Sequence, residues 1–413
     1  MVKKTKLNNG ITVLSDSVPE VATCSLGFWF SVGTRWDKPD RLGLAHFAEH
    51  MLFKGTQTRS ALKLAQDMDL LGGRMNAFTE QEQTCFYTVS LSEHLEASLE
   101  LLCDMYLNST LDPEELEREK SVVCEEIKMV EDSPDELASD IFYETIWPDH
   151  PLGKPIQGTV DIVKSFGREM LLDYYATYFV PNRLLISASG NIEHEHLVEL
   201  AEKFLGHLSA KDESNLDLNN LPGGLPQSQY VKIVKKHPTE QVSLCYGGQA
   251  LSLSDPRLCT LSVLDSVLGG SLSCRLFQEI REKSGLAYSV ETFRSSYYDT
   301  GLFGVEVGTS GANVGAVLEM IDRIFADIRR EGITAEELER SRQHLKSSLA
   351  LDMESTYGRM GYLVSSERIY GRYVGLKEAC KFIDEVDRDK VIDLARECLD
   401  TDRYSLVVLG PVD

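Results

Sequence analysis

The sequence predicts an α+β protein of two homologous domains, each a mostly antiparallel β-sheet flanked by helices. Two observations favour this fold class. Strand-like and helix-like runs follow one another in separate groups, which is typical of helices packed on an antiparallel sheet. The second half of the chain also repeats the plan of the first, most clearly where "RLLISASGNI" (residues 183–192) corresponds to "RYSLVVLGPV" (residues 403–412).

A polar segment divides the chain into nearly equal halves. Residues 211–229, "KDESNLDLNNLPGGLPQSQ", are rich in Asn, Gly and Pro and lack the period of either a helix or a strand. This composition is typical of a linker. We therefore expect an N-terminal domain at residues 1–210, a linker at 211–229 and a C-terminal domain at 230–413. A chain of 413 residues is also too long for one ordinary core.

Composition excludes several classes of function. The formal net charge of −23 repels nucleic acid and anionic membranes, and it favours cationic ligands such as basic peptides. No apolar run approaches the roughly 20 residues needed to span a bilayer. The first residues predict a strand and a turn, not a secretory signal. The nine cysteines are scattered without a close pair, as in reduced proteins. We expect a bacterial cytoplasmic protein, with the mitochondrial matrix as the alternative.

The stretch "RLGLAHFAEHMLFKGT" (residues 41–56) predicts a helix over residues 42–53 that carries three polar groups on one face. Helical spacing places His46, Glu49 and His50 together. The order H-x-x-E-H is the reverse of the H-E-x-x-H zinc helix. In such a site two imidazoles hold Zn²⁺, while a carboxylate that is not a ligand takes the proton from zinc-bound water. The alternative is a helix face with two hydrogen-bonded histidines.

A second predicted helix, from Pro113 onward, offers a third ligand. Glu119 and Glu126 lie two turns apart in a stripe that is otherwise apolar between Leu116 and Val130. A buried, unpaired carboxylate costs several kcal/mol by order of magnitude, so both side chains need positive partners. The alternative is a helix that is acidic all round. A His, His, Glu set leaves a fourth position open, which is the catalytic and not the structural pattern.

Four stretches carry a resemblance to a known family: "GLAHFAEHMLFKGT", "GGRMNAFTEQEQTCFY", "EREKSVVCEEIKMVEDSPDELASD" and "GGSLSCRLFQEIREKSGLAYSV". The chain resembles the pitrilysin/insulinase family of zinc peptidases, in particular its half-length branch, which includes the mitochondrial processing peptidase subunits and bacterial relatives. The resemblance implies one Zn²⁺ per chain, held by His46, His50 and Glu126. Glu49 would be the general base, and Glu119 a nearby carboxylate that steadies the site.

Glu125 is the rival of Glu126 for the third ligand, although it points off the apolar stripe. Residues 75–90, "MNAFTEQEQTCFYTVS", are strand-like and follow the turn residues Gly72 and Gly73. The resemblance implies that the first part of this strand is a sheet edge near the metal. A substrate peptide would add to this edge through main-chain hydrogen bonds. Asn76, Ala77 and Phe78 are the positions assigned to it, with an ordinary edge strand as the alternative.

The second half has no H-x-x-E-H and therefore no zinc site of its own. Arg281 and Tyr288 resemble the Arg/Tyr pair that this half of the family brings to the active site, where they would bind the substrate carbonyl and stabilise the oxyanion. A surface salt bridge is the alternative for Arg281. Arg275 is expected on a helix surface, outside the site. His194 and His196 alternate at a turn into a helix, and we do not expect them to bind a metal.

The sequence thus predicts a zinc-dependent endopeptidase that hydrolyses unfolded peptides or presequences bound as an extended strand, with Glu49 as general base for zinc-activated water. One chain carries both the metal set and the Arg/Tyr pair, so a homodimer is the expected assembly, and a heterodimer with a related subunit is the second. The alternative function is a non-catalytic structural or substrate-recognition subunit. Such relatives usually have damaged metal motifs, whereas every expected position is filled here.

Overall fold

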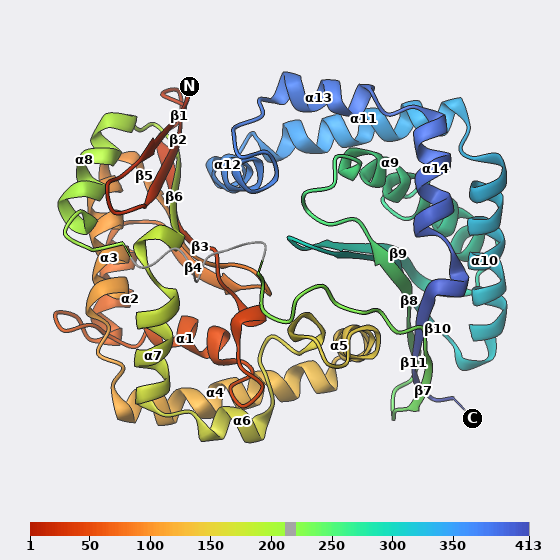
Figure 1. Ribbon diagram of the computed structural model, residues 1–413, viewed down its shortest axis with the longest axis horizontal. Helices are drawn as coiled ribbons and strands as arrows, with labels where there is room; N and C mark the ends of the chain where they lie inside the picture. The colour runs from red at the N-terminus through yellow and green to blue at the C-terminus, as the bar shows by residue number, and fades with distance from the viewer. Residues whose placement is uncertain (211–219, 413) are drawn as a thin grey trace. The chain divides into compact units, whose positions relative to one another are not determined.

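The computed structural model describes residues 1–210 and 220–412 and contains two mixed sheets flanked by helices (Figure 1). The predicted fold class is confirmed. Residues 211–219 of the predicted linker lie outside the described residues. The predicted domain limits at 210 and 230 stay a prediction. Among the described residues, no helix is both long enough and apolar enough to span a membrane.

Apart from β1(Val2–Lys6), which has no counterpart in the second sheet, the two sheets repeat one strand order within the described chain. The first runs β1(Val2–Lys6), β2(Thr12–Ser17), β6(Leu184–Gly190), β3(Thr23–Phe30), β5(Thr84–Leu91), β4(Arg74–Thr79). The second runs β7(Lys232–Lys236), β11(Tyr404–Gly410), β8(Val242–Ala250), β10(Gly301–Thr309), β9(Ala287–Ser296). In each, one parallel pair (β2 with β6, β7 with β11) is followed by antiparallel pairs. The two segments that suggested duplication, β6 and β11, hold equivalent places.

The helices fill the intervals between the strands. Those of the first half are α1(Leu44–Leu52), α2(Ala61–Leu70), α3(Leu95–Asn108), α4(Pro113–Asp132), α5(Pro134–Ile146), α6(Val160–Ser165), α7(Arg168–Tyr178) and α8(His194–Leu205). Those of the second half are α9(Leu258–Leu268), α10(Val314–Glu331), α11(Ala335–Asp352), α12(Thr356–Tyr370), α13(Leu376–Asp384) and α14(Arg388–Cys398), together with a π-helix at Phe277–Lys283.

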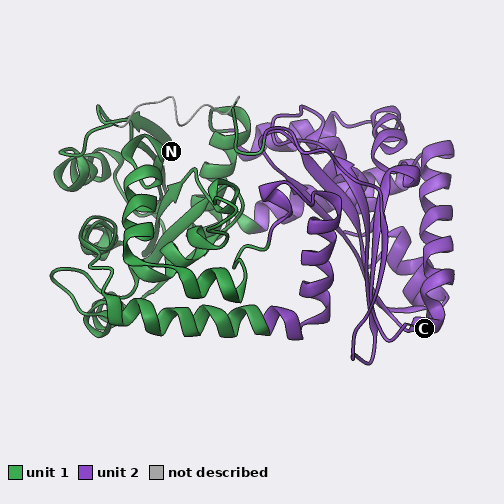
Figure 2. Cartoon of the chain, turned by 60° about the horizontal axis from the view of Figure 1, so that its bottom comes forward, with its two compact units in different colours: residues 1–128, 155–223, 352–373 green, residues 129–154, 224–351, 374–413 purple. Residues whose placement is uncertain are grey.

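The chain forms two compact units that do not follow its two halves (Figure 2). Unit 1 comprises residues 1–128, 155–223 and 352–373, and unit 2 comprises residues 129–154, 224–351 and 374–413. Each half thus gives one helix to the unit built mainly by the other. Helix α5 packs on β8 and β11 of unit 2, and α12 packs on β2, β3 and β6 of unit 1.

Each sheet can pack against a helix from the other half of the chain because successive side chains of a strand point to opposite faces. One face packs in the main core of its unit, and the other packs against α12 in unit 1 or α5 in unit 2. In β3, Phe28 and Phe30 enter the main core of unit 1, whereas Trp29 joins Met360 and Val364 of α12 on the other face. Unit 2 repeats the arrangement in β11, where Val407 meets Phe142 of α5. Both faces of each sheet are therefore covered by apolar packing.

The predicted strand at 75–90 is wrong in one respect, since it is a hairpin of β4 and β5. The polar run between Thr79 and Thr84 makes the turn, with Glu80 N–H donating to Gln83 C=O over 2.8 Å. The carbonyl groups of Glu80 and Gln81 also accept hydrogen bonds from the backbone of residues 34 and 35. Four polar residues in succession cannot continue a strand that is buried on both sides, so the chain reverses there.

Candidate metal centre

Helix α1 carries the histidine pair, and its start is fixed by two features. Gly43 has a φ of +87°, and a Cβ there would lie 2.2 Å from the carbonyl oxygen of Gln157, so only glycine fits. The buried carboxylate of Asp37 accepts hydrogen bonds from the N–H groups of Gly43 (2.9 Å) and Ala45 (3.1 Å). These are the amide groups that a helix start leaves without partners. The helix therefore begins at Leu44, two residues later than predicted.

The apolar face of α1 is fixed in the core of unit 1, where Phe47, Ala48 and Met51 are fully buried. Tyr175 of α7 also donates its hydroxyl hydrogen to the carbonyl oxygen of Ala48. Because these residues alternate with the polar ones at helical spacing, the opposite face presents the imidazoles toward α4.

Three ligand atoms converge between α1 and α4. The Nε2 atoms of His46 and His50 are 3.2 Å apart, and Oε2 of Glu126 lies 3.9 Å and 3.6 Å from them. Among the described residues, these three form the group of His, Cys, Asp or Glu side chains placed to hold a metal ion. The set is partly exposed, so an ion and a further ligand can reach it.

These residues fit zinc in both spacing and chemistry. In tetrahedral coordination at the usual Zn–N length, two ligand atoms are separated by about 3.3 Å. The separation of 3.2 Å between the imidazoles lies close to this value, and those of 3.6 and 3.9 Å to Glu126 are somewhat longer. Two imidazoles and one carboxylate also form a known catalytic donor set, which leaves one coordination position open.

Hydrogen bonding sets the ring orientation of His50. Its Nδ1 lies 2.8 Å from Oε1 of Glu119, and a carboxylate can only accept, so Nδ1 carries the proton. In the neutral ring this leaves the lone pair on Nε2, although the effect of burial is outweighed by Glu119 and the other nearby carboxylates, which raise the pKa of His50. Burial raises the pKa of Glu119, but hydrogen bonds from His50 and Lys54 outweigh it and hold the pKa below its usual range. Glu119 is thus a buried anion with two donors.

His46 is held as a neutral ring. Burial, together with the nearby His50, lowers the pKa of His46 to about 3. Only the neutral imidazole has a lone pair for a metal ion. Its Nδ1 atom is buried and has no hydrogen-bond partner among the described residues.

Glu49 lies on the same helix but outside the group of ligating atoms. Its side chain is buried, and Oε2 accepts a hydrogen bond of 2.6 Å from the hydroxyl of Thr79. Burial raises the pKa of Glu49, with the Thr79 bond acting in the opposite direction. A raised pKa brings a carboxylate closer to the range in which it can accept and return a proton at neutral pH.

Glu125 faces away from this cluster. Its side chain is 70% exposed and its Oε1 lies 2.7 Å from the ammonium of Lys128. Glu126, one residue later, turns toward the two imidazoles. The two adjacent acids therefore lie in different environments.

The predicted substrate residues all lie on β4, which ends the first sheet within the described chain. Ala77 packs toward the core that holds α1, and Phe78 packs against Trp29 on the opposite face, with ring centroids 5.5 Å apart. Asn76 is exposed, and its Oδ1 accepts the N–H of Ala77 over 2.9 Å. The outer edge of β4 offers the backbone groups to which an extended peptide pairs.

Arg281 and Tyr288 are neighbours within unit 2. The guanidinium carbon of Arg281 lies 5.8 Å from the ring centre of Tyr288 and 5.0 Å from that of Phe277, within the range of cation–π contacts. Tyr288 is 71% exposed at the start of the edge strand β9. Arg275 instead forms a bidentate ion pair with Glu337, at 2.7 and 2.8 Å.

The other histidine pair has a structural explanation. His194 is buried at the start of α8, and its two ring nitrogens lie 2.8 Å from the hydroxyls of Thr5 and Ser15. His196 is exposed on the same helix. His194 therefore has partners for both nitrogens without a metal.

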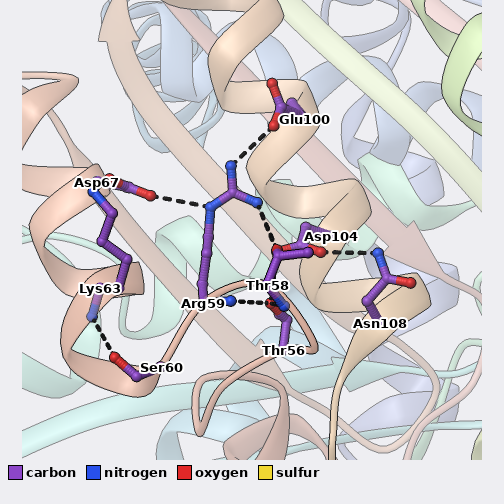
Figure 3. Close-up of polar contacts among 9 residues, drawn as sticks. All are labelled: Thr56, Thr58, Arg59, Ser60, Lys63, Asp67, Glu100, Asp104 and Asn108. Atoms are coloured by element: carbon purple, nitrogen blue, oxygen red, sulfur yellow. Dashed lines mark hydrogen bonds and ion pairs between the residues drawn. The ribbon is translucent and has the colours of Figure 1, made fainter.

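The loop between α1 and α2 is anchored by a polar network that sequence reasoning missed (Figure 3). Asp104 of α3 accepts hydrogen bonds from the hydroxyls of Thr56 (2.7 Å) and Thr58 (2.9 Å) and from Arg59 (2.7 Å). Arg59 also pairs with Glu100 (2.9 Å). The network holds the part of the chain that follows α1. Thr79 and Lys54 were missed because their partners, Glu49 and Glu119, are distant in sequence. Asp37 was missed although its partners lie only six and eight residues further on.

Comparison with known proteins gives the family. The family model described as "Insulinase (Peptidase family M16)" matches residues 12–160, and that described as "Peptidase M16 inactive domain" matches residues 165–345. A protein of Bacillus subtilis named uncharacterized zinc protease YmxG is 39% identical over 413 residues, covering 100% of this chain and 98% of that protein. The chain belongs to the insulinase, or M16, family of peptidases.

Further relatives agree with M16 membership. A protein of Mycobacterium leprae named as an uncharacterized zinc protease is 34% identical, covering 99% of this chain and 92% of its own length. Two solved structures share the M16 fold at a TM-score of 0.90 and 20% identity: a peptidase M16 inactive domain from Pseudomonas fluorescens and a protease from Helicobacter pylori. Each match covers 100% of this chain, together with 98% of the Pseudomonas fluorescens chain and 99% of the Helicobacter pylori chain.

Proposed function

We propose that this M16 protein is a zinc-dependent endopeptidase that hydrolyses unfolded peptides or presequences bound as an extended strand along β4. The observation that supports this most is the convergence of His46, His50 and Glu126 on one point, with Glu49 beside them but outside the ligand set. The names of the relatives as zinc proteases support the same class of reaction.

The proposed site residues divide the work of peptide hydrolysis. His46, His50 and Glu126 hold Zn²⁺, which when bound supplies a Lewis acid that makes water a nucleophile at neutral pH. Glu49 takes a proton from the attacking water on its carboxylate and returns it to the leaving amine. Thr79 keeps one oxygen of Glu49 hydrogen-bonded during this transfer.

Substrate binding is assigned to two elements. An extended peptide adds to the outer edge of β4 at Asn76, Ala77 and Phe78, using main-chain hydrogen bonds. Arg281 and Tyr288 bind the substrate carbonyl, where a guanidinium and a phenol stabilise developing negative charge. The net charge of −23 favours basic peptides.

We also propose that the protein forms a homodimer, since one chain carries both the metal set and the Arg/Tyr pair. We propose a bacterial cytoplasm as its compartment.

Cleavage of a library of quenched fluorescent peptides, measured together with zinc content, tests the proposal. Wild type should bind zinc and cleave peptides. Glu49→Gln should keep its zinc and lose about 10²–10⁴-fold in turnover, the usual contribution of a general base. The matched control, Glu125→Gln, removes an exposed acid of α4 and should keep full activity. Wild-type turnover in Glu49→Gln would contradict the role of Glu49. A zinc-loaded but inactive wild type would contradict the proposal for the chain alone.

A further inference from the structure

Lys54 pairs with Glu119, the carboxylate behind the candidate metal centre, and is not itself one of the three possible ligands. The residue lies two positions after the end of α1, and its ammonium lies 2.6 Å from Oε2 of Glu119. The Lys54 side chain is 28% exposed, whereas that of Glu119 is only 4% exposed. This lysine therefore brings its charge to a carboxylate that water scarcely reaches.

The two oxygens of Glu119 have separate partners. Oε1 accepts from Nδ1 of His50 at 2.8 Å, and Oε2 accepts from Lys54 at 2.6 Å. Because a carboxylate is planar and rigid, the two hydrogen bonds together fix its rotation. The position of Oε1 in turn fixes the ring plane of His50, whose Nε2 belongs to the ligand group.

Removing the ammonium would release this arrangement. Burying a carboxylate oxygen that has lost its charged donor costs free energy, and rotation of the side chain toward solvent would lower that cost. The hydrogen bond to His50 would then weaken or break. Partners of this kind behind a metal-binding histidine typically change metal affinity by about 10- to 100-fold.

We propose that Lys54 is a positioning residue of the metal centre, acting through Glu119 to hold the His50 ring in its metal-binding orientation. This inference rests on the proposed zinc site of His46, His50 and Glu126. It adds Lys54, which lies outside the ligand set, as a residue that influences how tightly the ion is held. Lys54 is not one of the three proposed ligands, so its expected effect is on zinc affinity, through Glu119.

Zinc affinity, measured by competition with a chelating dye on the full-length chain, tests this role without using activity. Lys54→Met keeps the apolar stem and should weaken zinc binding about tenfold or more. Lys54→Arg keeps the charge and should retain most of the affinity. The matched control is Lys120→Met, which removes an equally short ion pair, 2.6 Å from the exposed Glu117. It should bind zinc like wild type.

A double-mutant cycle shows whether Lys54 acts through Glu119. In a Glu119→Gln background, Lys54→Met should cause almost no further loss, since the carboxylate it orients is gone. An equal loss in both backgrounds would overturn the inference, as would unchanged affinity in Lys54→Met alone. Thermal unfolding of the zinc-free proteins shows whether each variant is folded, and Lys54→Gln, which also removes the charge, takes the place of Lys54→Met if the methionine variant is not folded. A wild type that binds no zinc would instead contradict the proposed function.

Discussion

The hydroxyl of Thr79 donates a hydrogen bond of 2.6 Å to Oε2 of Glu49. Thr79 is the last residue of β4, the candidate substrate strand, and Glu49 lies on α1 between the two histidines. Both side chains are buried. One hydrogen bond therefore joins the strand that we expect to bind the peptide to the carboxylate that we expect to accept the proton.

Thr79→Val should lower kcat roughly tenfold or more, because a hydrogen bond to a charged group contributes about 1.5–3 kcal/mol. Valine has nearly the same shape, so packing is retained and zinc affinity should not change. Thr79→Ser restores the hydroxyl and should recover most of the turnover. Steady-state kinetics with zinc analysis measures both, and a Thr79→Val protein with wild-type kcat would contradict the role.

The polar network behind α1 predicts a contrast between two acids that pair with Arg59. Asp104 is 6% exposed and binds two threonine hydroxyls as well, whereas Glu100 is 49% exposed. Asp104→Ala should lower the free energy of unfolding by about 2–4 kcal/mol, since buried donors lose their acceptor. Glu100→Ala should cost about 1 kcal/mol or less, as exposed ion pairs do. Equal losses in denaturant unfolding would contradict this account of the network.

Helix α12 should contribute strongly to the stability of unit 1, although it comes from the second half of the sequence. Met360 is fully buried against the sheet beside Trp29 and Tyr87. Met360→Ala should lower the free energy of unfolding by about 2–5 kcal/mol, as other large-to-small core substitutions do. Leu351→Ala removes a side chain that is 71% exposed and serves as the control. A Met360→Ala protein as stable as the control would show that α12 is not packed as described.

Glu306 should make stability depend on pH. Burial, with Glu291 and Asp135 nearby, raises the pKa of Glu306 from 4.5 to about 6. Below pH 4.5 the group is protonated in both the folded and the unfolded chain. As the pH rises from 4.5 to about 6, Glu306 ionises in the unfolded chain before it does in the folded chain, so the folded state loses stability.

Glu306→Gln removes this loss. The variant should be more stable than wild type by about 1–2 kcal/mol at pH 7–8, and the difference should vanish below pH 4.5. Thermal midpoints across this range measure the effect. Glu336→Gln, which removes an acid that is 86% exposed, is the control. A constant difference between Glu306→Gln and wild type at all pH values would contradict the assignment.

The sequence predicted the site residues that lie close together along one helix. His46, Glu49 and His50 share a face because helical spacing alone places them there, and Glu119 and Glu126 stand out as acids in an apolar stripe. The strand order of both sheets also agrees with the duplication visible in β6 and β11.

Relations between distant residues could not be predicted in this way. Nothing in the pattern of residues 134–146 or 356–370 tells which sheet each helix covers, because the apolar side chains of either helix could pack on the apolar face of either sheet. Lys54, Asp37 and Thr79 are ordinary loop and strand residues in sequence. Their roles follow only from the groups that the fold places beside them: side chains for Lys54 and Thr79, and backbone N–H groups for Asp37.

Zinc bound per chain, measured by elemental analysis after exhaustive dialysis, tests the central claim most directly. Wild type and Glu125→Gln should each retain one zinc ion, whereas His46→Ala should lose it and Glu126→Gln should hold it much more weakly. Full occupancy in Glu126→Gln with loss in Glu125→Gln would contradict the proposed ligand set, and a wild type without zinc would contradict the metal site itself.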